Sequence, residues 1–394
     1  MDLCVLESQT PPCALSRYSI AAFDLLDSLT LTPQNADSFE SELQTFVDRY
    51  AAQLHIEMPG LPFSGGVMGW LGYEKQDGFF AVYRQYWVWD HHHDLGWKIV
   101  FGEESSPHGI SPSFQRLSIP KPELTEEQYM TCVNRILAHI RQGDIYQANF
   151  SYRFSAVMSG DLWPVFARLR EVSPAPFGAF LRWKDGAIAS ASPEEFIRIQ
   201  GRHIQTRPIK GTSRRGQSAM EDQALGQQLL NSEKNRAELT MIIDLMRNDL
   251  SRICDYGSVK MVDPGIILEA YAQVFHLVAT IEGELRDTLH PVQALFSVFP
   301  GGSITGAPKR RAMEILDNLE VSPRSVYTGC IGYFGFDGCA HFNIAIRTVY
   351  CRNGHLYFHA GGGIVADSDP QEEWAETQVK ASGILAALDD LASI

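Results

Sequence analysis

One lysine stands in a stiff turn where a chemical role is possible. Lys210 lies between Pro208 and Gly211, directly after the alternating segment 203–207, which is typical of a strand. Proline fixes φ on one side, and glycine lets a ligand or another backbone come close on the other. A lysine held on a stiff turn at the end of a strand is either a surface charge or a nucleophile. The turn alone favours the surface charge, because most lysines are exposed.

Three glutamates stand in the two longest expected helices. The helix expected over 232–253 places Glu238 on an apolar face, where a carboxylate is costly unless it is paired or binds a metal. The helix expected over 370–391 carries Glu373 and Glu376, with Lys380 one turn further on. The spacing alone favours a solvated ion pair. The alternative is that carboxylates from both helices hold a Mg²⁺ ion, which keeps several waters and accepts a substrate carboxylate.

Two glycine-rich segments have the composition of anion-binding loops but not that of nucleotide sites. The segment Gly301–Lys309 fails the phosphate-loop spacing, because Ala307 and Pro308 separate its last glycine from the lysine. The segment Gly361–Ala366 matches a loose dinucleotide motif, but too little chain follows it to complete a dinucleotide-binding fold. Both segments therefore predict cradles of backbone N–H groups rather than nucleotide binding.

Composition and charge exclude several classes of function. The 394 residues are 45% hydrophobic and 20% charged, as in an ordinary globular protein, and the net charge is −14. An acidic chain of this kind is not expected to bind nucleic acid or an anionic membrane. The seven cysteines form no Cys-x-x-Cys pair, a pattern that suits a reducing compartment. Without an apolar run of signal or membrane-spanning length, we expect a cytoplasmic protein.

The pattern of elements predicts an α+β fold. Strand-like segments separated by short turns occupy 177–182, 187–190, 195–199 and 203–209, and short turns imply antiparallel neighbours. Thr125 and Gln128 form a capping-box pattern at the start of a helix that is expected to end near Gln142. Antiparallel strands with flanking helices argue against a doubly wound parallel sheet. The segment Glu103–Leu124 is rich in Ser, Pro and charge and is expected to connect a portion 1–120 to a catalytic portion 121–394.

Four segments together resemble the chorismate-utilising enzymes: 204–212, 236–249, 301–309 and 360–377. The resemblance is strong over about 125–390 and loose over the first hundred residues. It implies two large antiparallel β-sheets packed as a sandwich with helices on the outside. It also implies that the first 120 residues resemble the N-terminal region of anthranilate synthases.

The resemblance assigns roles to individual residues. It implies Mg²⁺ on the ring carboxylate of chorismate, held by Glu238 and Glu376 with Glu373 close by. It implies Glu194 as the general acid that protonates the departing C4 hydroxyl. Glu195 is expected to face solvent as the next residue of the same strand. His276 is either an active-site residue or a structural core residue. The residues implied to contact the substrate are Gly211, Thr212, Ser303, Tyr327, Arg347, Gly361, Gly362 and Gly363.

Two positions distinguish the branches of this family. Gln147 stands where the relatives that add water carry a lysine base, which disfavours water addition because glutamine cannot take a proton from water. Lys210 stands where anthranilate synthases carry alanine, and it resembles the lysine of the branch that aminates chorismate at C4. That role requires an amine whose pKa is lowered from about 10.4. A separate glutamine amidotransferase subunit is the implied source of ammonia. The alternatives are amination at C2, as in anthranilate synthesis, and a non-catalytic chorismate-binding subunit.

Overall fold

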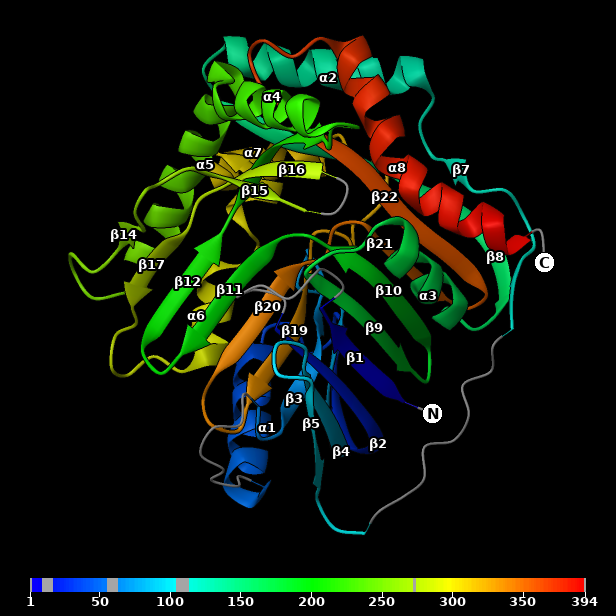
Figure 1. The fold of residues 1–394 in the computed structure, drawn as a ribbon, viewed down its shortest axis with the longest axis vertical. Coiled ribbons are helices and arrows are strands. Elements are labelled where there is room, and N and C mark those ends of the chain that lie inside the picture. The colour runs from blue at the N-terminus through cyan, green and yellow to red at the C-terminus, as the bar shows by residue number, and fades with distance from the viewer. Residues whose placement is uncertain (1, 9–16, 55–62, 104–112, 272–273, 393–394) are drawn as a thin grey trace.

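The computed structural model describes residues 2–8, 17–54, 63–103, 113–271 and 274–392. Long antiparallel strands form its centre, and helices lie around them (Figure 1). The helices are α1 (Phe39–Leu54), α2 (Glu126–Arg141), α3 (Trp163–Val172), α4 (Ala219–Leu230), α5 (Glu233–Ser251), α6 (Pro291–Val298), α7 (Lys309–Asp317), α8 (Pro370–Ala392) and the 3₁₀ turn η1 (Gly302–Ile304). No helix within the described ranges is long and apolar enough to cross a membrane.

The strands are arranged in two halves. Hydrogen-bonded order in the first half is β17 (Ile281–Glu284), β12 (His203–Arg207), β11 (Glu195–Gln200), β20 (Ala340–Ile344), β19 (Cys330–Gly335), β3 (Gly66–Leu71) and β4 (Gly78–Asp90). The order in the second half is β2 (Tyr18–Leu31), β1 (Leu3–Glu7), β9 (Phe177–Trp183), β10 (Gly186–Ser192), β21 (Thr348–Arg352), β22 (His355–Ile364) and β8 (Gln147–Gly160). Pairing of β4 with β2 joins the halves.

Short strands extend this arrangement. The strand β5 (Leu95–Val100) pairs with β4, and β14 (Lys260–Met261) pairs with β17. The strands β6 (Phe114–Arg116), β7 (Lys121–Pro122) and β18 (Gly306–Ala307) all pair with β8. All of these pairs are antiparallel.

Three apolar cores give the molecule its layers. The middle core lies between the two halves and includes Trp70 and Tyr83 from one half and Trp183 and Ile188 from the other. A second core joins α1, α5 and α6 to the outer face of the first half, and a third joins α2, α3, α7 and α8 to the second half. This is the expected α+β sandwich of antiparallel sheets with helices outside, and the prediction is confirmed.

Local signals in the sequence account for the ends of the main helices. The Thr125 side chain accepts a hydrogen bond from the backbone of Gln128, whose side chain bonds back to Thr125, so α2 begins with the predicted capping box. Ser232 caps α5 in the same way through the backbone N–H of Asn235. The expected boundary near residue 120 stays a prediction, and strands from both sides of it pair with each other, as β1 does with β9 and β3 with β19.

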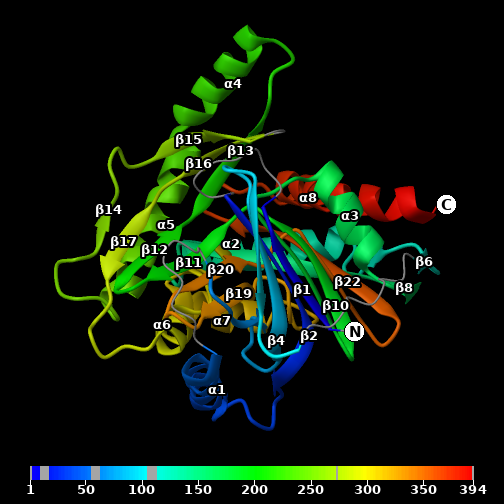
Figure 2. The same ribbon diagram turned by 60° about the horizontal axis from the view of Figure 1, so that its bottom comes forward.

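A small separate sheet covers one end of the two halves. It consists of β13 (Ile209–Arg214), β16 (Val274–Val278) and β15 (Ile267–Ala270), and α4 projects beside it (Figure 2). The register of β13 against β16 shifts between Lys210 and Thr212, where Gly211 has φ of 69°. Only glycine adopts this φ readily. The segment expected to be a turn is therefore a strand with a bulge at Gly211, and the bulge changes the direction of the Lys210 side chain relative to that of Thr212.

Candidate active site

A cavity of about 550 Å³ lies between β8 and β22, the small sheet, α5 and α8. Its walls contain almost every residue that the sequence analysis selected. They include Glu194, Lys210, Gly211, Thr212, Glu238, His276, Ser303, Tyr327, Arg347, Gly361, Gly363, Glu373 and Glu376. Gly362 is not part of the wall; it faces the Glu373 carboxylate on α8, which a β-carbon at position 362 would approach to 3.2 Å.

Lys210 points into this cavity from β13. Its Nζ donates a hydrogen bond of 3.5 Å to the carbonyl oxygen of Ser303. Burial lowers the pKa of the Lys210 amine below its usual 10.5, while the carboxylates of Glu238 and Glu194 act in the opposite direction. Gly363 stands beside it, since a β-carbon there would lie 3.5 Å from Nζ. Lys210 is therefore not a surface charge.

Glu194 has the environment of a carboxylic acid that keeps its proton near neutral pH. The residue is 5% exposed, and burial raises the pKa of its carboxyl group from 4.5 to about 7. A hydrogen bond of 2.6 Å from the Ser303 hydroxyl to Oε1 opposes this shift, as does the charge of Lys210. Ser303 thus contacts both the acid and the amine, through its hydroxyl and its carbonyl oxygen respectively.

The glutamates of α5 and α8 meet lysines at the other end of the cavity. Lys380 Nζ lies 2.6 Å from Glu376 Oε1, and both side chains are about half exposed, at 47% and 54%. Burial would raise the pKa of Glu376, but the charge and hydrogen bond of Lys380 outweigh it and lower the pKa. The pKa values of Glu238 and Glu373 are raised, chiefly by burial. The ion pair expected from spacing is present, and it faces the cavity.

The oxygen donors of this cluster suit a hard cation. Among the residues that the structure describes, no three His, Cys, Asp or Glu side chains converge as a complete metal site. Mg²⁺ does not require such a site, because it usually takes one or two protein carboxylates and completes its shell with water and substrate oxygens. The raised pKa values of Glu238 and Glu373 mean that these carboxylates gain from a nearby cation. The donor set therefore fits Mg²⁺.

Arg347 and His276 form a further wall. Burial lowers the pKa of the Arg347 guanidinium, and no carboxylate in the described part of the chain offsets that burial. Burial and the charge of Arg347 lower the pKa of His276 to about 4, so its ring is neutral at pH 7. His276 Nδ1 lies 3.2 Å from the carbonyl oxygen of Gly211 and 3.1 Å from the hydroxyl of Thr212. His276 supports the strand of Lys210, and Arg347 remains available for an anionic ligand.

Other residues of the cavity did not emerge from the sequence. Asn149, Lys234 and His359 line it as well, and the His359 ring stacks on Tyr327 with centroids 4.9 Å apart. Asn149 had a readable signal, since it alternates with Gln147 on β8 and so shares its face. The position of Lys234 in the cavity depends on how α5 packs against the other elements, which no local pattern encodes.

Glu195 and Gln147 are both buried. The expectation that Glu195 faces solvent is wrong: it is 2% exposed and its carboxylate contacts Gln205 and, at 2.9 Å, His341. Burial would raise the pKa of Glu195, but the hydrogen bond and charge of His341, with smaller contributions from Arg198 and Gln205, lower it. Gln147 is fully buried, and neither polar atom of its side chain has a hydrogen-bond partner among the described residues.

A buried arginine holds the floor of the cavity. Arg324 is 1% exposed and pairs through Nε with Glu320 at 2.7 Å. Its two terminal nitrogens donate to the carbonyl oxygens of Ile304 and Asn149, at 2.8 and 2.5 Å. Both acceptors belong to residues that line the cavity. Arg324 therefore connects the segment after Ser303 to strand β8.

Comparison with known proteins places this fold and cavity in one family. The family model described as chorismate binding enzyme matches residues 17–386, and the chain belongs to this family. It is 41% identical over 357 residues to aminodeoxychorismate synthase component 1 of Salmonella typhimurium, covering 84% of this chain and 78% of that protein. It is 40% identical over 413 residues to the Escherichia coli protein of the same name, covering 95% and 90% respectively. The crystal structure of anthranilate synthase component I from Streptococcus pneumoniae TIGR4 matches with a TM-score of 0.78 at 29% identity, covering 95% of this chain and 93% of that one.

Proposed function

We propose that this protein aminates chorismate at C4 and forms 4-amino-4-deoxychorismate, an intermediate of 4-aminobenzoate synthesis. One observation carries the proposal: a lysine of lowered pKa, Lys210, faces the same cavity as Glu194, whose pKa is raised to about 7. The high identity to proteins named aminodeoxychorismate synthase component 1 supports it.

The substrate is a dicarboxylate, and the cavity offers two kinds of anion site. Arg347 suits one carboxylate, because a planar guanidinium binds carboxylates through two parallel hydrogen bonds. The backbone of Gly361 and Gly363 and the side chain of Tyr327 line the adjoining wall. We assign the ring carboxylate to a Mg²⁺ ion held by Glu238 and Glu376, with Glu373 next to them. When bound, the ion would neutralise charge on the substrate and on these glutamates.

The chemistry uses Lys210 and Glu194 in two steps. The neutral amine of Lys210 adds to C2, both ring double bonds shift, and the C4–O bond breaks. The hydroxyl leaves as water because Glu194 gives it a proton, for which a pKa near the working pH is suited. Ammonia then adds at C4, both double bonds shift back, and the C2–N bond breaks, which returns Lys210 as a neutral amine. Solvent reprotonates Glu194.

Charge in the cavity works for and against Lys210. Burial favours the neutral amine, whereas Glu238 and Glu194 favour the ammonium. Protonation of Glu194 removes one of these opposing charges, so the acid and the nucleophile are in their active forms together. Ammonia is supplied by a separate glutamine amidotransferase subunit in this proposal, which the component 1 naming of the relatives supports.

The test is the identity of the product. The full chain is incubated with chorismate, Mg²⁺ and ammonium chloride, and the products are identified by mass spectrometry. We expect 4-amino-4-deoxychorismate, with no product when Mg²⁺ is chelated. Fluorescent anthranilate would show amination at C2 instead, and tight chorismate binding without turnover would show a non-catalytic subunit.

A further inference from the structure

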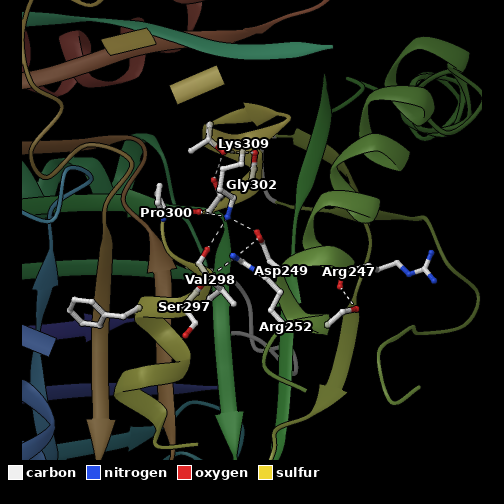
Figure 3. A network of polar contacts seen from close by, with 12 residues as sticks. Arg247, Asp249, Arg252, Ser297, Val298, Pro300, Gly302 and Lys309 are labelled. Atoms are coloured by element: carbon white, nitrogen blue, oxygen red, sulfur yellow. Dashed lines mark hydrogen bonds and ion pairs between the residues drawn. The ribbon is translucent and has the colours of Figure 1, made fainter. Parts of the chain in front are cut away.

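Lys309, which the sequence analysis excluded as a phosphate-loop lysine, is the centre of a buried polar network. It is the first residue of α7, and its side chain is 16% exposed. Its Nζ donates to Asp249 Oδ2 at 2.5 Å, to the carbonyl oxygen of Val298 at 3.0 Å and to that of Pro300 at 2.8 Å (Figure 3). One ammonium group thus joins α5 to the end of α6 and to the segment that follows it.

Asp249 has a second cationic partner. Arg252 Nη2 donates to Asp249 Oδ1 at 3.0 Å and to the carbonyl oxygen of Ser297 at 3.0 Å (Figure 3). The Asp249 side chain is 3% exposed. Because Arg252 would remain, removal of the Lys309 charge does not leave the buried carboxylate without a cation. The contribution of Lys309 can therefore be measured by replacing it.

The segment that Lys309 holds leads directly into the active site. Three residues after Pro300, Ser303 donates to Glu194 and accepts from Lys210. Between them, Gly302 lies against α5 so closely that a β-carbon would be 2.8 Å from Leu245. The helix that carries Asp249 also carries Glu238. The network therefore fixes the Ser303 segment relative to the helix of a proposed metal ligand.

We propose that Lys309 is a positioning residue of the amination reaction: by joining Asp249 to the carbonyl oxygens of Val298 and Pro300, it determines where Ser303 meets Glu194 and Lys210. The role assigned to Glu194 rests on the proposed function, whereas the effect on the Ser303 contact does not. A purely structural lysine would stabilise the fold without changing the properties of Glu194.

The Ser303 contact supplies the readout. Burial raises the pKa of Glu194, and the Ser303 hydrogen bond opposes that rise. A displaced Ser303 therefore raises the pKa of Glu194 further. This pKa is measured without turnover, from the infrared band of the protonated carboxyl group that disappears in the Glu194→Gln variant.

The experiment compares full-length Lys309→Met, Ser303→Ala and the double variant with the original protein. We expect both single variants to raise the pKa of Glu194 and the double variant to match Ser303→Ala alone, because Lys309 acts through Ser303. We expect kcat to fall about 10- to 100-fold in Lys309→Met, as for a small misplacement of a reacting group, with a smaller change in KM for chorismate. Lys309→Arg should recover part of the loss.

Lys260→Met is the matched control. Lys260 also pairs with a carboxylate, that of Glu282, but its side chain is 70% exposed and it lies on β14, which pairs with β17. Its substitution should leave the pKa of Glu194 and kcat unchanged. If Lys309→Met does not fold, Asp249→Asn weakens the same contact while keeping an acceptor, and it should raise the pKa of Glu194 in the same direction.

The outcomes separate this inference from the proposed function. An unchanged pKa of Glu194 in folded Lys309→Met, or an additive effect in the double variant, overturns the positioning role. Failure of the unmodified protein to aminate chorismate overturns the proposed function, while a shift in the pKa of Glu194 would still establish that Lys309 positions Ser303.

Discussion

Glu194 and Glu195 are adjacent, buried and predicted to respond oppositely to pH. The pKa of Glu194 is about 7 in the folded protein against 4.5 as its ordinary value. The folded state therefore binds more protons between these values, so its stability is greatest below pH 4.5 and falls as the pH rises through 7. The difference corresponds to about 3 kcal/mol when the carboxyl group is fully ionised. Glu194→Gln removes this penalty, because an amide does not ionise.

The assay is urea unfolding at about pH 5 and about pH 8.5, with the free energy of unfolding compared between variant and original protein. We expect Glu194→Gln to gain about 2 to 3 kcal/mol relative to the original protein between the two pH values. Glu195→Gln is the control, and its stability relative to the original protein should not change between these two pH values, because Glu195 titrates below them. The pKa of Glu195 is lowered, so its ionised form stabilises the fold at high pH, and this is lost as the pH falls through the folded pKa.

The result at the higher pH decides the matter. If Glu194→Gln is no more stable than the original protein at about pH 8.5, the pKa of Glu194 is not raised in the folded protein, and its proposed role as a general acid fails. If Glu195→Gln gains stability between the two pH values as Glu194→Gln does, the different environments assigned to these neighbours are wrong.

Three further predictions concern single residues. Lys210→Ala should slow 4-amination at least about 100-fold in a mass-spectrometric rate assay, and Lys210→Arg should not restore it because a guanidinium stays charged; unchanged turnover in Lys210→Ala would exclude a covalent role. Glu238→Gln should weaken Mg²⁺ binding about tenfold or more in isothermal titration calorimetry, and equal affinities would remove Glu238 from the metal site. Arg324→Met should lower the free energy of unfolding by about 3 to 5 kcal/mol in urea, because Glu320 would be left buried without its cation, and a neutral result would contradict the assigned pair.

The sequence predicted the parts of this structure that local physics controls. The cap at Thr125 is satisfied within four residues of chain, so its signal is complete in the sequence. The short turns between strands predicted an antiparallel arrangement, which the structure has. The four matching segments predicted the family, which the family model confirms. Site residues from these segments line one cavity.

The error at Glu195 shows where local patterns are insufficient. Strand alternation placed Glu194 inside and Glu195 outside, but β11 is a central strand covered on both faces, and its register shifts after Glu195. The partner that makes burial tolerable, His341, comes from β20. The contact between Lys380 and Glu376 joins residues four apart on one helix, so the sequence pattern could predict it. The contact between Lys309 and Asp249 joins two elements that are distant in the chain, so no local pattern could predict it.

The pairing of early strands with late ones has a consequence for biosynthesis. The strand β1 gains its second neighbour only after Trp183 has been made, and β3 gains β19 only after Gly335. At ordinary ribosomal rates of about 5–20 residues per second, the edge of β3 that pairs with β19 therefore stays unpaired for tens of seconds. Its six residues are all buried in the finished molecule. A nascent chain with such an apolar, half-paired edge is a natural client for chaperones, and pauses in translation before β19 should lower the yield of folded protein.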